Sequence, residues 1–343
     1  MSPNAAWKRI LDISPRVQEA ITHRLPVVAL ETAVITHGLP YPANWELAIR
    51  MVDAVHLAGA VPAVIGVYQG RIRVGMTGDE IEDLARRSRA RLLPPEARLS
   101  GWEEPPAKVS VRDLAALVVR EGARAYGGTT VAATAWIAHL VGIRFFATGG
   151  IGGVHLHPSY DISADLPTLA RTPVLVVSAG AKAVLDLDAT VEYLETWGIP
   201  VLGYQTVHFP AFFSRESDWK VPHPLWPTGP LTAEEKAARI AYLHWHVLKQ
   251  PSGVLLAVPP PKSDSSSIQP LPWAEVKRTV QQAQTEAEEQ GIRGAEVTPF
   301  LLDRLAQLTK ARTVEINIEL LLNNARIAAQ VARHYWAYRR EEE

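Results

Sequence analysis

The sequence predicts an α/β fold, with a mixed, mostly parallel central sheet that helices cover on both faces. Three short apolar runs, at residues 26–30, 143–147 and 174–177, have the length of strands and alternate with segments of helical spacing. The last two runs are almost entirely apolar, which is typical of parallel strands buried on both faces. Each of these two is followed by a glycine-bearing turn. Because ligands of open α/β sheets bind beyond the carboxyl ends of the strands, we expect the functional site there.

The composition excludes several classes of protein. The chain has 343 residues and a formal net charge of −1, so nothing global favours a nucleic-acid or membrane surface. It has no cysteine, which excludes disulfides and thiol nucleophiles. No apolar run is long enough to span a membrane, and residues 1–24 lack the apolar core of a signal peptide. We therefore expect a cytoplasmic protein whose residues 1–343 form a single domain.

The first part of the chain alternates helix and strand. We expect a helix at 10–22, a strand at 26–30, a helix at 44–57 and two strands within 61–74 that turn at Gly70. Thr77 and Glu80 have the spacing of a capping box, which predicts a further helix that ends near Arg87. Residues 86–106 are first arginine-rich and then rich in proline and glutamate, without a clean period. We interpret them as a surface insertion.

The rest of the chain continues the alternation. We expect helices at 110–121, 129–141 and 188–197, strands at 143–147, 174–177, 200–204 and 254–258, and mainly helix over 273–338. Residues 209–224 are aromatic and irregular, which suits a wall or lid over a site. Residues 259–272 are rich in proline and serine and predict a loop.

Two charged side chains at strand ends are candidates for chemistry. Glu31 ends an apolar strand, where partial burial would raise the pKa of a carboxyl and suit a general acid; the alternative is a solvated glutamate. Lys182 follows the strand at 174–177 through the small turn S-A-G-A. An amine held there can form imines with carbonyl carbons, and the alternative is a lysine at a helix N-terminus with its head in water.

Carboxylates and glycines between these strands offer further sites. Asp161, Ser163 and Asp165 could hold a hard cation such as Mn²⁺ or Mg²⁺, or could cap a helix. His155 and His157 could ligate a metal, although H-x-H in a glycine-rich loop is a weak signal. The glycines of 149–153 could form an anion nest or a plain tight turn.

Other candidates lie farther along the sequence from these turns. Residues 127–130, which end in Thr130, precede an expected helix and could cradle a phosphate. Lys108 could pair with a phosphate or be a solvated lysine. Three asparagines of the C-terminal helical region could read a base edge or lie on a helix surface: Asn317, Asn323 and Asn324.

These residues lie in long motifs that run from about Pro26 to Ala332. The motifs are ALETAVITHGLPYP, GAVPAVIGV, KVSVRDL, GGTTVAAT, FATGGIGGVH, DISADL, AGAKAVLDL, YLETWGIPV, FPAFFSR, GAEVTPFLL and LLNNAR. So many specific motifs in one order are not expected by chance. The set closely resembles the pseudouridine-5′-phosphate glycosidase family, also called the indigoidine synthase A-like family.

The resemblance implies a fold, an activity and site residues. Members of this family reversibly cleave the C–C glycosidic bond of pseudouridine 5′-phosphate to uracil and ribose 5-phosphate, use a divalent cation, typically Mn²⁺, and form homotrimers. By motif, Glu31 matches the family's proton donor, Lys182 its imine-forming nucleophile and Asp161 its metal ligand. The expected substrate-binding set is Lys108, Thr130, Val131, His155, Ser163, Ala164, Asp165 and, for the base, Asn317.

Two departures from the family pattern concern the pocket. The segment between the GGVH and DISAD motifs is shortened to residues 156–160, and Val258 stands where the family's A-N-P-I-P-like stretch has an asparagine. The resemblance therefore leaves the preferred base open. The alternatives are a C-glycosynthase that joins ribose 5-phosphate to another aromatic acceptor, and a non-catalytic sugar-phosphate binding protein. The presence of Glu31 and Lys182 argues against the last alternative.

Overall fold

A mixed sheet forms the centre of the structure, a computed structural model that describes residues 9–92, 104–156, 161–262, 269–292 and 297–342. Within these residues the sheet has 11 strands, nine of which follow the order β1-β4-β3-β2-β7-β8-β11-β9-β10, while β5 and β6 pair beside β3. The strands are β1 (Leu11–Ile13), β2 (Val27–Leu30), β3 (Val61–Tyr68), β4 (Arg71–Val74), β5 (Ala107–Val109), β6 (Gly127–Thr129), β7 (Phe145–Ala147), β8 (Leu175–Ser178), β9 (Val201–Tyr204), β10 (His223–Leu225) and β11 (Val254–Ala257).

Most neighbouring strands are parallel. Only the pairs β3–β4 and β3–β6 are antiparallel among the described strands. The central strands β2, β7, β8 and β11 are buried along their whole length, with the sequences VVAL, FFA, LVVS and VLLA. Continuous apolar strands of this kind are stable only when both faces of the sheet are covered. The predicted fold class is confirmed.

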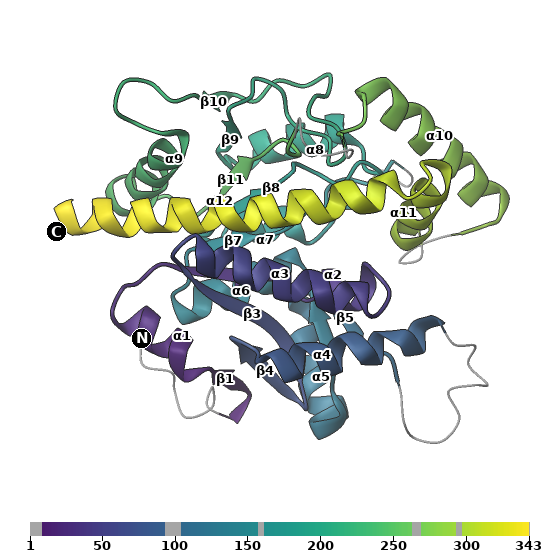
Figure 1. Cartoon of the computed structure of the whole chain (residues 1–343), viewed down its shortest axis with the longest axis horizontal. Coiled ribbons are helices and arrows are strands. Elements are labelled where there is room, and N and C mark those ends of the chain that lie inside the picture. Colours follow the sequence, from purple (N-terminus) through teal and green to yellow (C-terminus); the bar gives the residue numbers. More distant parts are fainter. Residues whose placement is uncertain (1–8, 93–103, 157–160, 263–268, 293–296, 343) are drawn as a thin grey trace.

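Helices provide that cover. They are α1 (Pro15–Thr22), α2 (Ala33–His37), α3 (Ala43–Leu57), α4 (Gly78–Arg87), α5 (Leu114–Glu121), α6 (Val131–Val141), α7 (Asp165–Leu169), α8 (Leu187–Thr196), α9 (Ala233–Tyr242), α10 (Trp273–Glu289), α11 (Val297–Leu308) and α12 (Arg312–Glu342). In Figure 1, α12 and α3 run side by side in front of the central strands, and α6 and α7 lie behind them. The described helices include none that is both long and apolar enough to cross a membrane.

Local signals in the sequence account for several helix starts. The capping box predicted for Thr77 and Glu80 is present at the start of α4. A second one joins Ser110 and Asp113 before α5. These caps satisfy backbone N–H groups that have no partner inside the helix.

Two expectations about the elements were wrong. The helix expected at 10–22 begins only at Pro15, because Leu11–Ile13 forms β1 and pairs with β4. Residues 107–109 and 127–129 form β5 and β6, two strands that the sequence did not predict. They pair with each other and with β3, so tertiary pairing rather than local propensity holds them as strands.

Part of the segment interpreted as a surface insertion packs onto the domain. Residues 86–92 complete α4 and add a 3₁₀ turn (Ser88–Leu92), in which Ala90 is buried. Residues 93–103 lie outside the described residues, and for them the insertion stays a prediction. The predicted aromatic wall is confirmed in part, because Phe212 and Phe213 line the candidate site.

Candidate active site

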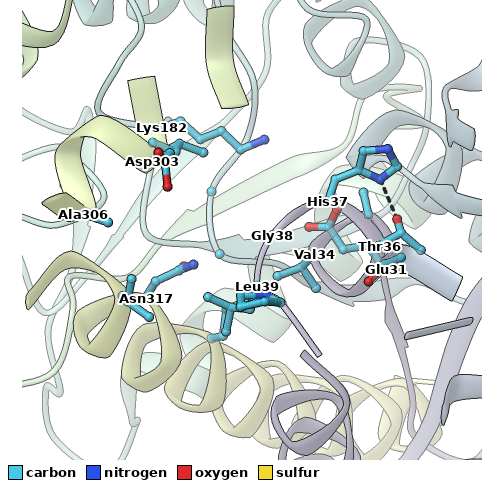
Figure 2. Close-up of a pocket in the computed structure, with 18 of the residues that line it drawn as sticks. Glu31, Val34, Thr36, His37, Gly38, Leu39, Lys182, Asp303, Ala306 and Asn317 are labelled. Atoms are coloured by element: carbon cyan, nitrogen blue, oxygen red, sulfur yellow. Dashed lines mark hydrogen bonds between the residues drawn. The ribbon is translucent and has the colours of Figure 1, made fainter. Parts of the chain in front are cut away.

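A cavity of about 540 Å³ lies at the carboxyl ends of the central strands. The segments that follow β2, β7 and β8 form one side of it, and α11 and α12 contribute another (Figure 2). Four of the residues predicted for the site line this cavity: Glu31, Lys108, Lys182 and Asn317. The parallel order β2-β7-β8 brings three of the turns together, as expected for an open α/β sheet.

Glu31 is the residue directly after β2, and its side chain is almost enclosed, with 9 % of its surface exposed. The hydroxyl of Thr148 donates a hydrogen bond to its Oε1. Burial raises the pKa of the Glu31 carboxyl, while the positive charge of Lys182 and the Thr148 hydrogen bond act in the opposite direction. The carboxyl is thus biased toward its protonated form, as the sequence led us to expect for a general acid.

Lys182 reaches the same cavity from the turn after β8 (Figure 2). Its backbone N–H donates to the carbonyl of Ile151 at 3.1 Å, which ties the turn after β8 to the loop after β7. Gly180 in this turn has φ +76°, and a Cβ there would lie 2.0 Å from the carbonyl oxygen of Pro210. Only glycine fits this conformation and this contact, so the S-A-G-A sequence holds the lysine in place.

Lys108 extends from β5 and remains solvent-exposed at the cavity wall. Desolvation by the surrounding protein and the positive charge of Lys182 lower the pKa of its amine, and the carboxylates of Asp165 and Glu31 oppose this effect. Two amines and a buried carboxyl therefore interact across one cavity. Such an arrangement is typical of functional sites.

Asn317 projects from α12 toward the cavity (Figure 2). Its Oδ1 is buried and has no hydrogen-bond partner among the described residues. Because this oxygen is enclosed next to Gly149, the amide nitrogen is the group of Asn317 that points toward the cavity in Figure 2. The other two candidates differ: Asn324 is buried and donates to the Thr148 carbonyl at 2.8 Å, and Asn323 accepts from Arg326 on the helix surface.

Asp165 does not line the cavity; it joins the start of α6 to the glycine loop, whose residues Gly149 and Gly150 line the cavity. Its Oδ1 accepts from the N–H of Ala132 at 2.8 Å, and its Oδ2 accepts from the N–H of Gly152 at 2.7 Å. A Cβ on Gly152 would lie 2.2 Å from the hydroxyl oxygen of Ser163. This part of the glycine run therefore serves close packing, and the Gly152 N–H is unavailable for the anion nest considered above.

The start of α6 lies next to Asp165. Thr130 is the N-cap, and its hydroxyl accepts from the N–H of Ala133 at 3.4 Å. Because Asp165 takes the N–H of Ala132, the N–H of Val131 is the one in this turn without a protein acceptor among the described residues. A free N–H at a helix start can bind an anion. Ser163 is partly buried and accepts from the N–H of Asp165, whereas Ala164 is exposed.

Asp161 and His155 lie together beside the cavity. A bridge between Val154 and Ile162 brings them close, and the His155 N–H donates to the Asp161 carbonyl at 2.9 Å. Burial lowers the pKa of His155, and the negative charge of Asp161 raises it. Residues 157–160, including His157 and most of the shortened loop, lie outside the described residues.

The donors at Asp161 fit only a water-rich cation. Among residues whose placement is described, no three carboxylate or imidazole groups cluster as a metal site. The Asp161 carboxylate is exposed, with one imidazole beside it. Such a donor set fits a hard divalent cation that keeps most of its water ligands, as Mg²⁺ does and Mn²⁺ can.

Several residues of the site were not anticipated. Thr148 contacts Glu31, and the cavity lining includes His37, Thr36 and Arg91. Thr148 could have been predicted as a site residue, because it directly follows the strand at 143–147. It therefore lies beside Glu31, which directly follows a neighbouring strand. Val258, the departure noted in the sequence, is buried, extends β11 with an N–H bond to Ser178 and is absent from the cavity lining.

Comparisons with known proteins agree with this geometry. The family described as "Indigoidine synthase A like protein" matches residues 16–334. The chain is 42 % identical over 338 residues to "Pseudouridine-5′-phosphate glycosidase 2" of Photorhabdus laumondii, covering 98 % of this chain and 99 % of the relative. It is also 42 % identical over 328 residues to the pseudouridine-5′-phosphate glycosidase of Escherichia coli, covering 95 % and 96 %.

Two solved structures share the fold. The prealnumycin C-glycosynthase AlnA, in complex with ribulose 5-phosphate, has a TM-score of 0.81 and 35 % identity, with 99 % of this chain and 100 % of that chain covered. An indigoidine synthase A-like protein of Thermotoga maritima has a TM-score of 0.77 and 32 % identity, with 94 % and 95 % covered. The chain therefore belongs to the indigoidine synthase A-like protein family.

Proposed function

We propose that the protein reversibly cleaves the C–C glycosidic bond of pseudouridine 5′-phosphate, giving uracil and ribose 5-phosphate, through an imine on Lys182. The observation that carries the proposal is the pairing in one cavity of Glu31, whose carboxyl pKa is raised by burial, with the amine of Lys182. The names of relatives at 42 % identity over nearly the whole chain support this substrate.

The substrate explains why an acid and an amine are both required. A carbon–carbon bond to uracil has no basic leaving atom, so protonation of the leaving group alone cannot open it. Protonated Glu31 can instead donate its proton to O4′ of the ribose, which breaks the C1′–O4′ bond as electrons flow from the uracil ring. The sugar is then an open chain with an electrophilic C1′.

The amine of Lys182 can then bond to C1′ and lose a proton. When C5 of uracil takes up a proton, the nitrogen lone pair expels uracil, the C1′–C5 bond breaks and the imine forms. The proton that Lys182 loses balances the proton that C5 gains. Water hydrolyses the imine to ribose 5-phosphate and the free amine, so one difficult step becomes several easier ones.

The remaining predicted residues fit the two ends of this substrate. Lys108 and the free N–H of Val131 offer a positive charge and a donor for the phosphate, with Ser163 and Asp165 beside them. The amide nitrogen of Asn317 faces the cavity and offers a donor, which suits a carbonyl oxygen of uracil. Thr130, His155 and Ala164 complete the substrate set that we propose.

We further propose Mn²⁺, or another divalent cation, as cofactor. Asp161 would hold it, with His155 adjacent and water in the other positions. When bound, such a cation would supply positive charge that neutralises and orients the phosphate. The protein's own residues carry out the proton transfers and the bond to C1′.

A second candidate activity has a specific observation in its favour. The C-glycosynthase AlnA covers 99 % of this chain at a TM-score of 0.81, so the same site could join ribose 5-phosphate to another aromatic acceptor. The apolar side of the cavity near Asn317, with Phe212, Phe213 and Leu321, would accept a planar ring of either kind. A non-catalytic sugar-phosphate binding role is the third alternative.

One assay separates these functions. Purified protein is incubated with pseudouridine 5′-phosphate and Mn²⁺, and released uracil is measured by chromatography. We expect uracil release by the wild type and its loss in Lys182→Ala and Glu31→Gln. Failure to release uracil, combined with condensation of ribose 5-phosphate with a larger aromatic acceptor, would favour the C-glycosynthase. Binding of ribose 5-phosphate without either reaction would favour the third role.

A further inference from the structure

The contacts of His37, at the end of α2, favour one tautomer of its imidazole. Its Nδ1 lies 2.6 Å from the hydroxyl oxygen of Thr36 (Figure 2). That hydroxyl donates its only proton to the carbonyl of Thr32 at 3.1 Å, one turn earlier. Both contacts are satisfied when Nδ1 of His37 carries the ring proton and donates it to Thr36. The other ring nitrogen, Nε2, is then an acceptor with a lone pair.

This acceptor is open to the cavity. His37 lines the cavity and is only half-buried. Across the described residues, Nε2 has no hydrogen-bond partner, and it is not among the buried polar atoms that lack one. A ligand that enters the cavity therefore meets Nε2 with its lone pair free.

The surroundings keep the imidazole neutral. Burial, the guanidinium of Arg91 from the 3₁₀ turn and the amine of Lys108 from β5 lower the pKa of His37 to about 3. A neutral ring that holds its proton on Nδ1 can accept a hydrogen bond at Nε2 but cannot donate one there. It therefore requires an O–H or N–H group on the ligand, and phosphate oxygens do not satisfy it.

The position of His37 indicates which hydrogen-bond donors of the proposed substrate can reach it. In Figure 2, His37 and Asn317 lie on opposite sides of the cavity, with Lys182 reaching in between. If the base lies at Asn317 and C1′ at Lys182, the sugar extends toward His37. The donors that a ribose chain presents there are its hydroxyls.

We propose that Nε2 of His37 accepts a hydrogen bond from the 2- or 3-hydroxyl of the sugar phosphate and so selects ribose over deoxy sugars. The inference rests on the proposed function, because it takes ribose 5-phosphate as the ligand. His37 and Glu31 lie at the two ends of the same short unit, the end of β2 and α2. The segment that supplies the general acid would thus also bind a hydroxyl of the sugar.

Calorimetric binding tests this without requiring turnover. The affinities of ribose 5-phosphate, 2-deoxyribose 5-phosphate and 3-deoxyribose 5-phosphate are measured for the wild type, His37→Leu and His37→Gln. We expect His37→Leu to weaken binding of ribose 5-phosphate by about 3- to 10-fold, which is the value of one hydrogen bond. For the deoxy sugar that lacks the bonded hydroxyl, leucine should have no effect. The three sugars differ in the fraction that is open-chain. The affinity of each variant is therefore compared with that of the wild type for the same sugar.

Conservative variants separate a hydrogen bond from a packing role. His37→Gln should retain most of the affinity, because its Oε1 can occupy the place of Nε2. Thr36→Val keeps the imidazole but removes the hydroxyl that accepts the Nδ1 proton. It should therefore weaken the binding of ribose 5-phosphate by about threefold, whereas Thr36→Ser should not. The matched control is His23→Gln, because His23 is an exposed histidine outside the cavity lining. The effect of His37→Leu should not change between about pH 5 and pH 8.

The outcomes also separate this inference from the proposed function. If His37→Leu weakens the binding of all three sugars equally, the role of His37 is overturned. Uracil release by the wild type would still leave the proposed function intact. Absence of ribose 5-phosphate binding to the wild type would overturn both. Circular dichroism shows whether His37→Leu folds. If it does not fold, the affinities of the three sugars are measured for Thr36→Val instead, and an equal loss of affinity for all three would overturn the role of His37.

Discussion

The Thr148 hydroxyl donates a hydrogen bond to Oε1 of Glu31 at the point where two central strands end together. The register pairs Leu30 of β2 with Ala147 of β7, so Glu31 and Thr148 are each the first residue beyond the sheet. Asn324 of α12 donates to the Thr148 carbonyl and fixes it from the other side. The acid is therefore held by a strand neighbour and, one step further, by the long C-terminal helix.

Removing this hydrogen bond should change the pH dependence of turnover. The Thr148 bond favours the charged carboxylate, so Thr148→Val should raise the pKa of Glu31 further. A general acid acts only while protonated, and the alkaline limb of the kcat/KM profile should therefore move to higher pH. We expect kcat to fall by about tenfold as well, because the carboxyl loses its orientation.

Thr148→Ser is the matched control and should retain both the profile and most of the rate. The measurement is uracil release at a series of pH values. An alkaline limb that stays in place in Thr148→Val would contradict the assignment of Glu31 as the titrating acid.

Asp165 should matter more for architecture than for charge. Each of its carboxylate oxygens accepts from one backbone N–H, at Ala132 and at Gly152. Asp165→Asn has one oxygen and one NH₂ group, so one N–H must lose its acceptor. We expect a loss of about 1–3 kcal/mol in the free energy of unfolding and a weaker affinity for ribose 5-phosphate.

Denaturant unfolding and calorimetry measure these two effects. Asp186→Asn is the control, because Asp186 caps α8 through one N–H bond and asparagine caps equally well. Equal stability of the Asp165 and Asp186 variants would show that the bridge between α6 and the glycine loop contributes little.

The proposed cofactor predicts a metal-dependent rate. Mn²⁺ should stimulate uracil release by the wild type, and Asp161→Ala should lose most of that stimulation. Asp79→Ala, an exposed carboxylate in the first turn of α4, serves as the control and should respond to Mn²⁺ normally. An unchanged Mn²⁺ response in Asp161→Ala would reject Asp161 as the ligand.

The family resemblance predicts a homotrimer. Light scattering coupled to gel filtration should give three times the chain mass of 37.6 kDa. A monomer mass at micromolar concentration would reject this assembly.

The central part of the fold could be predicted from the sequence because its strands are buried on both faces. The runs that became β2, β7 and β8 are continuous apolar segments, and their order along the sheet brings Glu31, Thr148 and Lys182 to one edge. The capping boxes that begin at Thr77 and Ser110 could be read from residue spacing alone. In these places, local chemistry and tertiary structure favour the same conformation.

The missed elements depend on distant partners. β6 begins with Gly127 and Gly128, which have low strand propensity, and it is a strand because β3 and β5 pair with it. Gly128 is required there because a Cβ would lie 2.0 Å from the hydroxyl of Thr36. No pattern within residues 127–129 contains this information.

The site residues that were missed follow the same rule. Asn324 was a candidate reader of a base, yet its helical position faces the Thr148 carbonyl instead of the cavity. His37 gave no periodic signal, and its role depends on Thr36 and on charges from two other elements. Side-chain direction and long-range charge decide such roles, and both are set only when the chain has folded.

The imine on Lys182 is the central claim, and reductive trapping tests it most directly. Borohydride is added to the protein with ribose 5-phosphate, and peptides are mapped by mass spectrometry. We expect a stable secondary amine that carries the sugar phosphate on Lys182 and on no other lysine, Lys108 included, and no adduct in Lys182→Ala. Cleavage of pseudouridine 5′-phosphate by Lys182→Ala at the wild-type rate, or an adduct on Lys108 alone, would contradict the claim.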